Sequence, residues 1–476
     1  MKKLLPLIVL LLLATWAGAT WLISGQVEQN FDRALNQLNS KLAQDLPFVE
    51  VKPASFHKGF FKSEATSQVT LTGPQDDADM LPLRHVIYHG PVMLTPLGVK
   101  TGSTYIVTSI DMDMLPAETR DKINDLTGGD TPLTVGMLTG TSKDFDLDIE
   151  VASLQLDDPQ NSQTTIRFEG MHGALKSDLQ GSYLTGKLAN GKISIADQNG
   201  QQVEIAPTTI RFDIDEMYKG TVLSGSSSLT TAQLLIHSPA LETRAENLSF
   251  TSATTQAGNG TTSASATFNT SPASIEVASK NIRFTDGTVD FTTRFEGIDT
   301  TALKKLVDAG ADLHSLEIAA MKKGEVAPEK IQQNLDSYLS AVIDLLKPGL
   351  ESTTRLDIGN PQGKAWFDLA LNYAETRPVT ELATLRDLIA AIDGRLEIVS
   401  DKPLLRSLSL DGLAAMPIAM GFATADNDQI RSEVTISKGV LSINGQPAPF
   451  LEMLGPILDV PSPLRRLTAD TSGHSV

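Results

Sequence analysis

The sequence predicts an α+β protein dominated by β-structure. It would have an N-terminal transmembrane helix, followed by a long, curved antiparallel sheet with amphipathic helices packed on it. Three observations predict this architecture. The chain opens on a long uncharged apolar run, most of residues 47–296 alternate between apolar and polar side chains, and residues 297–350 place apolar side chains three and four positions apart.

The N-terminal segment, residues 1–23, is predicted to cross a membrane. Leu4–Ile23 carries no charge, and a helix of that length spans about 30 Å, the thickness of a bilayer core. Lys2 and Lys3 favour a cytoplasmic N-terminus and an exported body. The run Ala17–Ala19 has the A-x-A form of a cleavage site, so a removed signal peptide is the alternative. In both cases the body is expected outside the cytoplasm.

An amphipathic helix is predicted over residues 24–46, because apolar side chains recur at spacings of three and four before Pro47. The β-rich body then follows over residues 47–296. Turn sequences rich in Gly, Asn and Asp separate its predicted strands, which include 63–73, 103–114, 164–170 and 191–195.

The clearest alternation lies at residues 143–156. Phe145, Leu147, Ile149 and Val151 are predicted on one face, with Asp144, Asp146, Asp148 and Glu150 on the other. The acidic row suggests either a calcium site or a solvated strand face. Alternate side chains of a strand lie about 7 Å apart and do not converge, which favours the solvated face.

Helices are predicted over residues 300–316 and 328–349 within the helical segment 297–350. Residues 351–455 form a mixed part with strands over 364–373 and 394–400, a helix over 380–392 and a closing hairpin over 428–450. Residues 456–476 are rich in Pro, Ser and Thr and are expected to be a mobile tail.

Composition argues against several classes of function. The net charge of −18 opposes nucleic-acid binding, and the absence of cysteine removes thiolate chemistry and disulfides. The chain has no motif of a zinc protease, a serine hydrolase or a nucleotide-binding loop. His85 and His89 lie four apart in a predicted strand, hence about 13 Å apart and too far to share a metal. We therefore expect no catalytic residue, cofactor or metal, with a hydrolase assembled from distant residues as a remote alternative.

Three short motifs are expected to have structural roles. In "FHKGFF", Gly59 suits a bend as the chain leaves the N-terminal helix, with Phe56 beside it and Phe60 or Phe61 packing between helix and sheet. In "YHGP", His89 would end a strand and hydrogen-bond a neighbouring carbonyl, while Gly90 and Pro91 turn the chain. In "INGQ", Asn444 and Gly445 would form a hairpin turn.

Several stretches occur in one order along the chain: the N-terminal apolar run, "FHKGFFKSEA", "HGP", "LTGKLANGKISI" and "GVLSINGQ". With these the chain resembles the YdgA-like (YdgA/YihF) bacterial inner-membrane proteins, a family without an assigned biochemical function. The resemblance implies a single-pass inner-membrane anchor, a periplasmic β-rich body and a capacity to self-associate. It implies no catalytic residue.

Two functions follow from these observations. The first is a non-enzymatic envelope protein, anchored in the bilayer through Leu4–Ile23, whose one-sided sheet acts as a scaffold or as a groove for a lipid ligand. The second is an assembly or sensor protein that binds itself or an envelope partner through its amphipathic helices. The state of the apolar sheet face, open or covered by helices, distinguishes between them.

Overall fold

The computed structural model describes residues 27–448 and residue 455, with gaps at 30, 34, 37, 41, 43–48, 73–77, 140–143, 159–163, 179, 278–281, 324–327, 376–381 and 383. The chain divides into two compact units. Unit 1 comprises residues 1–159, 165–193 and 315–326, and unit 2 comprises residues 160–164, 194–314 and 327–476.

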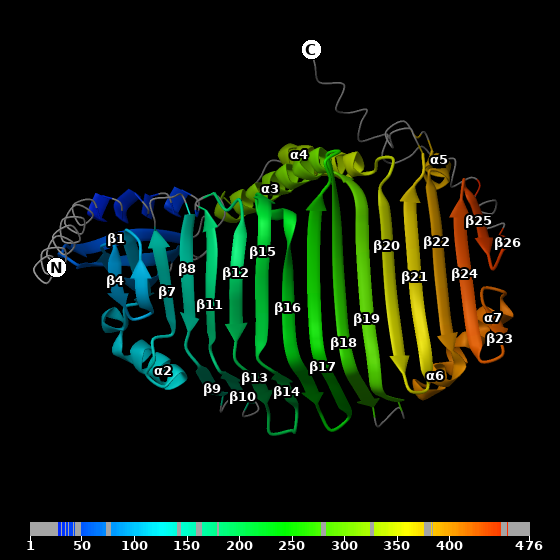
Figure 1. Ribbon diagram of the computed structural model, residues 1–476, viewed down its shortest axis with the longest axis horizontal. Coiled ribbons are helices and arrows are strands. Elements are labelled where there is room, and N and C mark those ends of the chain that lie inside the picture. Colours follow the sequence, from blue (N-terminus) through cyan, green and yellow to red (C-terminus); the bar gives the residue numbers. More distant parts are fainter. Residues whose placement is uncertain are drawn as a thin grey trace, which may run out of the picture. The chain divides into compact units, whose positions relative to one another are not determined.

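Unit 1 is built on an antiparallel sheet in which neighbouring strands mostly follow each other along the chain (Figure 1). Its strand order is β1 (Val49–His57), β2 (Lys62–Thr72), β3 (Ala78–His89), β6 (Thr104–Ile110), β7 (Leu133–Thr139), β8 (Asp144–Val151), β11 (Met171–Asp178) and β12 (Leu184–Asn190). A separate hairpin joins β4 (Val92–Thr95) to β5 (Gly98–Thr101). Shorter strands are β9 (Leu154–Asp158), β10 (Thr164–Phe168) and β13 (Ile193–Ala196).

The predicted strands of this region are confirmed, with one difference. The strand predicted over 103–114 ends at Ile110, and the 3₁₀ turn η1 (Met112–Met114) and helix α2 (Ala117–Thr127) follow. The sequence did not predict α2, because its residues have no continuous apolar stripe. Pro116 precedes the helix, and Gly128 ends it with φ = 66°.

An N-terminal helix covers one side of the unit 1 sheet. Its described residues lie within 27–42, inside the predicted amphipathic helix. Val27, Phe31 and Leu35 are buried against Val51 of β1, Ala65 of β2 and Ile87 of β3. The three- and four-residue spacing seen in the sequence therefore matches the side of the helix that contacts the sheet.

The predicted transmembrane segment at residues 1–23 and the predicted tail at 456–476 lie outside the described residues. Within the described part of the chain, no helix is both long and apolar enough to cross a bilayer.

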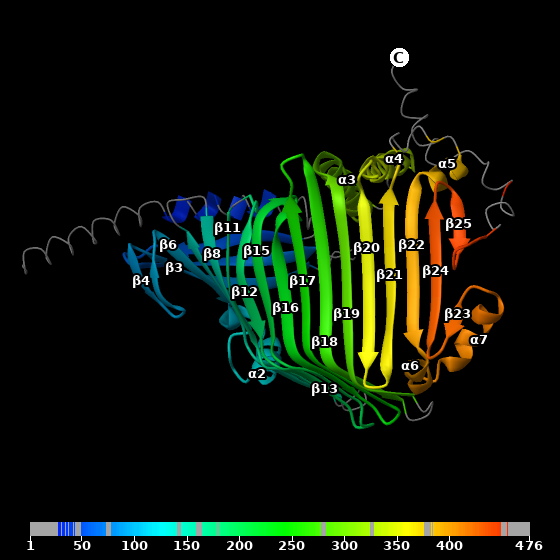
Figure 2. The same ribbon diagram turned by 45° about the vertical axis from the view of Figure 1, so that its right-hand side comes forward.

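Unit 2 contains a second antiparallel meander of longer strands (Figure 2). Its order is β15 (Thr208–Tyr218), β16 (Thr221–His237), β17 (Leu241–Gln256), β18 (Thr261–Val277), β19 (Ile282–Asp299), β20 (Glu351–Asn360), β21 (Gly363–Tyr373), β22 (Ile392–Asp401), β24 (Gln429–Ser437), β25 (Val440–Ile443) and β26 (Gln446–Pro447). Strands β14 (Gln202–Ile205) and β23 (Thr424–Asp426) extend the edges of β16 and β24.

The long strands are irregular at several places, and the β15–β16 pairing shifts register near Glu216. The register between β18 and β19 shifts between Thr270 and Ile275, which is a bulge. Figure 1 shows β17 and β18 changing direction toward the end of the sheet where this bulge lies. Curvature within this part of the sheet thus has a local cause in the backbone.

In the described residues of the second half of the chain, the structure contains α3 (Thr300–Lys323), α4 (Pro328–Leu345), α5 (Leu385–Ala390), α6 (Lys402–Ser407) and α7 (Asp411–Ala419). The two long helices confirm the predicted helical segment, although α3 continues past residue 316. The helix predicted over 380–392 is too long, since β22 already begins at Ile392. The short helices α6 and α7 were not predicted.

The helices of unit 2 cover the ends of one sheet face and leave its middle open. Ile343 of α4 packs with Tyr373, the last residue of β21. Leu404 of α6 packs near the opposite end, on Ile358 of β20 and Ala365 of β21. In unit 2, the expectation of helices packed on the sheet is therefore correct only at the two ends of the strands.

Candidate functional site

A large concave site lies within unit 1, between the N-terminal helix and the sheet. It is a groove of about 920 Å³. Five strands form its floor: β3, β6, β7, β8 and β11. Apolar side chains that line it are Phe31, Leu35, Leu38, Val51, Leu83, Ile106, Met137 and Phe145.

The register explains why the floor is apolar. Ile106 lies opposite Met137, and Met137 lies opposite Leu147. Residues opposite each other in a sheet share one face, so the alternation of each strand adds to a continuous apolar surface. At about 4.8 Å per strand, these five strands make a floor about 19 Å wide.

His85 is the main polar side chain of the floor, and it is fully engaged. Its Nε2 lies 2.7 Å from the Ser67 hydroxyl, and its Nδ1 lies 2.9 Å from the Thr108 hydroxyl. The edge of its ring contacts Phe31, with ring centres 5.1 Å apart. Burial lowers the pKa of His85 to about 4, so its imidazole is neutral near pH 7.

The polar groups at the β11 end of the groove are engaged as well. Ser177 donates to the carbonyl of Tyr183 over 2.6 Å. The backbone N–H of Ser182 donates to Asp178 over 2.8 Å, and the Ser182 hydroxyl also donates to it. These hydrogen bonds hold the pKa of Asp178 below its usual value. Arg33, Asn36 and Ser40 of the N-terminal helix also line the groove, and the rest of its exposed surface is mainly apolar.

His89, the histidine singled out in the sequence, closes a turn and does not line the groove. Its Nδ1 lies 3.0 Å from the carbonyl oxygen of Phe60, and its Nε2 lies 3.0 Å from the Ser63 hydroxyl. The expected carbonyl hydrogen bond is therefore present. His89 is 2% exposed, and burial lowers its pKa. Gly90 follows with φ = 132°, and its N–H donates to Ser103 as the chain turns at Pro91.

The structure corrects the expectation for "FHKGFF". Gly59 lies in the turn between β1 and β2, where a Cβ would stand 2.0 Å from the carbonyl oxygen of Lys62. Phe60 and Phe61 are exposed and contact each other edge to face. Phe56 packs against the helix instead, with its ring centre 6.1 Å from that of Phe31. Phe56, near the end of β1, thus has the packing role that was expected of Phe60 or Phe61.

The hairpin expected at "INGQ" is present. Asn444 and Gly445 have φ of 51° and 76° and connect β25 to β26. The Asn444 side chain also accepts a hydrogen bond from the Glu433 N–H over 2.9 Å. The turn therefore fixes β24 as well as its own two strands.

The acidic row of β8 is only partly a solvated face. Asp148 accepts hydrogen bonds from the Tyr105 hydroxyl over 2.7 Å and from Lys100 over 2.6 Å. Tyr105 is completely buried and reaches Asp148 across β7 at Gly136, where a Cβ would stand 1.9 Å from its hydroxyl. The sequence analysis missed this cluster. A glycine inside the strand-like run "LTVGMLT" was the available signal.

Unit 2 presents an apolar strip on the sheet face between α4 and α6. One transverse row crosses eight neighbouring strands and contains only apolar side chains. Its members, taken strand by strand, are Ile210, Leu229, Phe250, Phe268, Phe291, Leu356, Phe367 and Ile398. The row is about 34 Å long at about 4.8 Å per strand. We call these eight residues the apolar strip.

The side chains around the apolar strip are either apolar or hydrogen-bonded to each other. Phe250 and Ile398, within the strip, and Phe295 and Leu371, on the same face, are each between 40% and 43% exposed. In the neighbouring row, the hydroxyls of Ser227 and Ser252 lie 2.8 Å apart, and those of Thr293 and Thr354 lie 3.0 Å apart. These hydroxyls satisfy each other and do not require a polar ligand.

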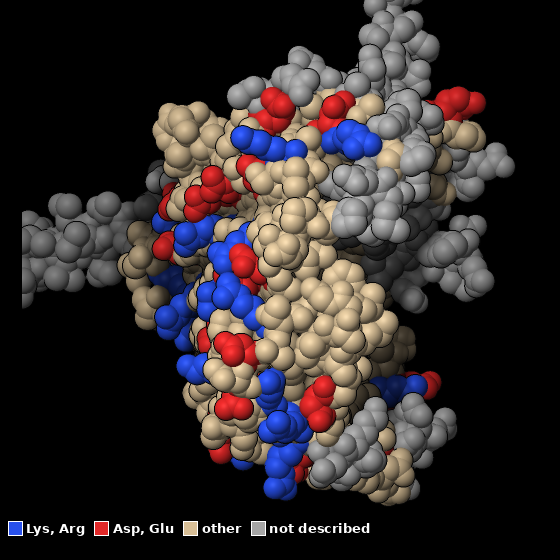
Figure 3. Space-filling model, turned by 90° about the vertical axis from the view of Figure 1, so that its right-hand side faces the viewer, with Lys and Arg blue, Asp and Glu red and all other residues tan. Residues whose placement is uncertain are grey.

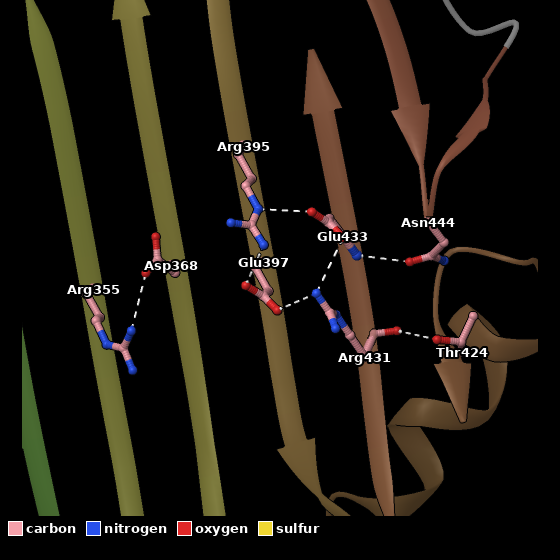
Figure 4. Close-up of polar contacts among 8 residues, drawn as sticks. All are labelled: Arg355, Asp368, Arg395, Glu397, Thr424, Arg431, Glu433 and Asn444. Atoms are coloured by element: carbon pink, nitrogen blue, oxygen red, sulfur yellow. Dashed lines mark hydrogen bonds and ion pairs between the residues drawn. The ribbon is translucent and has the colours of Figure 1, made fainter. Parts of the chain in front are cut away.

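The opposite face of the sheet is charged at β22 and β24. Arg395 and Arg431 form ion pairs of 2.9 Å with Glu433 and Glu397, respectively (Figure 4). Figure 3 shows such side chains gathered in a band beside a broad area without charge. Exposed pairs of this kind contribute little stability. They mark the face that stays in water, which leaves the apolar strip as the surface available to an apolar ligand.

Catalytic arrangements have no comparable support among the described residues. A histidine and a carboxylate approach each other at His237 and Glu242, but their 3.8 Å separation exceeds a hydrogen bond. In the parts of the chain that the structure describes, no three histidine or acidic side chains are grouped as metal ligands would be.

A family model described as "Bacterial protein of unknown function (DUF945)" matches residues 1–450. No curated protein and no solved structure matches the chain.

Proposed function

The chain belongs to DUF945, a bacterial family of unknown function, and we propose that it has a non-enzymatic role in lipid binding at the cell envelope. The unit 1 groove binds the hydrocarbon chain of a lipid. Leu4–Ile23 anchors the protein in the inner membrane, and the body lies in the periplasm, as in the YdgA-like proteins that the sequence resembles.

The groove itself carries this proposal. Its volume of about 920 Å³ falls near the top of the ~300–1,000 Å³ range of small-molecule sites. Its exposed lining is mainly apolar, and His85, Ser177 and Asp178 are already hydrogen-bonded to protein groups. A hydrocarbon chain gains from contact with such a surface.

A groove variant tests the proposal directly. Met137→Arg places a charge on the floor, and Leu133→Arg is its control on the same strand and face, outside the groove lining. The full-length protein, purified in mild detergent, is titrated with a fluorescent fatty acid. We expect Met137→Arg to weaken binding at least ~10-fold, equivalent to ~1.4 kcal/mol, and the control to bind like the wild type.

Lipid extraction supplies a second measurement. Mass spectrometry of gently purified wild-type protein is expected to detect co-purified lipid, and Met137→Arg should carry much less. Wild-type protein that carries no lipid and does not bind the fatty acid would rule out the proposal. Circular dichroism of each variant checks that the sheet is intact.

Self-association is the second candidate function. Ile331 and Leu335 lie four positions apart on α4 and are both exposed. Two such helices can pack along these side chains. Cross-linking in intact cells tests this role: Ile331→Asp should abolish a cross-linked dimer, and a purely monomeric wild-type pattern would exclude self-association.

A further inference from the structure

Among the described residues of unit 2, helix α7 and the turn after it form a highly exposed apolar segment. Leu413 and Met416 are 72% and 70% exposed, and Met420 and Phe422 are exposed as well. Asp411 is the only charged residue between positions 411 and 425. We call Leu413, Met416, Met420 and Phe422 the α7 tip.

The α7 tip is held firmly by the sheet. Ser432 of β24 donates its hydroxyl hydrogen to the carbonyl of Phe422 over 2.6 Å. Asn444 donates to the carbonyl of Gly421 over 3.2 Å. Ala423 is buried directly after the tip, and Thr424 donates to Arg431 over 3.3 Å (Figure 4). The exposed side chains therefore project from a fixed base.

The pattern of α7 points to lipid as the occupant. A helix that docks in a protein groove has one apolar face and one polar face. The run "GLAAMPIAM", residues 412–420, has no polar side chain on any face, and no residue of α7 is buried. A helix that is apolar all round suits a surrounding apolar medium. At about 1.5 Å per residue, α7 is about 14 Å long, which is too short to cross a bilayer core of about 30 Å.

We propose that the α7 tip inserts into one leaflet of a lipid bilayer and gives unit 2 a membrane contact of its own. The four side chains enter the boundary between headgroups and acyl chains, and Asp411 stays at the water side. This inference does not rest on the groove of unit 1, since it concerns different residues and a lipid surface rather than a single bound chain.

The absence of cysteine makes a background-free test possible. Met416→Cys is labelled with an environment-sensitive fluorophore in the full chain, which is then reconstituted with phosphatidylcholine vesicles containing nitroxide-labelled lipid. Val440→Cys, an exposed apolar position on β25, is the matched control. We expect the emission at position 416 to shift to the blue and to be quenched by the nitroxide, while position 440 keeps its fluorescence.

A second pair of variants separates insertion from chance proximity. Adding Leu413→Ser and Phe422→Ser to Met416→Cys should remove the blue shift and the quenching, while adding Ile275→Ser and Val440→Ser should not. Unchanged emission of Met416→Cys with and without vesicles would overturn the proposal. So would a blue shift that needs no lipid and grows with protein concentration, since that would assign the tip to a second copy. If the protein does not bind the fatty acid but labelled Met416→Cys is still quenched, the groove proposal is wrong and the α7 proposal stands.

Discussion

At the scale of single residues, buried polar side chains of unit 1 are fixed by partners far away in sequence. Asp148 holds Tyr105 from another strand, and His85 holds Ser67 and Thr108 from the two strands beside it. Each of these contacts depends on close approach between strands. A small substitution where a side chain passes close over a neighbouring strand should therefore lower the stability of the protein strongly.

Gly136→Ala should be strongly destabilising. The new Cβ would stand 1.9 Å from the Tyr105 hydroxyl and 2.6 Å from its ring. Either the tyrosine leaves Asp148 or β7 shifts, and overpacking of this kind costs about 1–3 kcal/mol. Urea unfolding measures the loss. Gly258→Ala is the control, because no atom lies within 4 Å of its Cβ position. Equal unfolding midpoints for the two variants would show that the Tyr105 side chain does not pass over β7 at Gly136.

His85 should make stability depend on pH below neutrality. Its pKa is about 4 in the folded protein, against 6.5 in the unfolded chain. The unfolded chain therefore binds more protons between these values, so stability is complete above pH 6.5 and is lost as pH falls toward 4. The contribution is roughly 3 kcal/mol. Thermal unfolding of the wild type and of His85→Gln between pH 7 and pH 4 should show a shallower decline in the variant. Parallel curves would show that His85 titrates normally.

At the scale of elements, the local pattern predicted what the chain forms but not what each element touches. Alternation at 143–156 placed Phe145 and Leu147 on one face, and the register confirms this. Spacing in 24–46 predicted the helix that buries Phe31. The partner of that helix could not be predicted, because the choice among Phe56, Phe60 and Phe61 depends on where the β1–β2 turn lies.

Two phenylalanine variants should therefore behave differently. Phe31 is 6% exposed and contacts Phe56 and His85, so Phe31→Ala should cost about 3–5 kcal/mol and release the helix. Phe61 is 50% exposed, and Phe61→Ala should change stability by less than about 0.5 kcal/mol. Hydrogen exchange of residues 27–42 provides the measurement. Similar protection in both variants would mean that Phe31 does not hold the helix on the sheet.

At the scale of the whole molecule, the sequence predicted a β-dominated chain with antiparallel pairing, and both units confirm it. It could not predict the groove or the apolar strip. Both surfaces arise from register between strands, and register follows from the lengths and shapes of many turns together. The sequence directed attention to His89, although His85 of the same strand lines the groove. The alternation of the strand places His85 and His89 on one face. Which of the two lines the groove depends on where the N-terminal helix lies, and the sequence did not predict that.

Net charge should govern which membranes the α7 tip enters. The chain carries −18, so anionic vesicles repel it, and the repulsion is screened by salt. At low ionic strength, nitroxide quenching of labelled Met416→Cys should be weaker in vesicles containing anionic lipid than in phosphatidylcholine alone. The difference should close at about 1 M salt, where the Debye length is about 3 Å. A preference for anionic vesicles would point instead to a local cationic contact.

The apolar strip has a consequence for how such a surface changes in evolution or by design. Each strand contributes one side chain to the row, and each hairpin contributes two. Duplication or loss of a hairpin would lengthen or shorten the row in fixed steps of about 10 Å while leaving its chemistry unchanged. The number of hairpins therefore sets the length of the apolar strip.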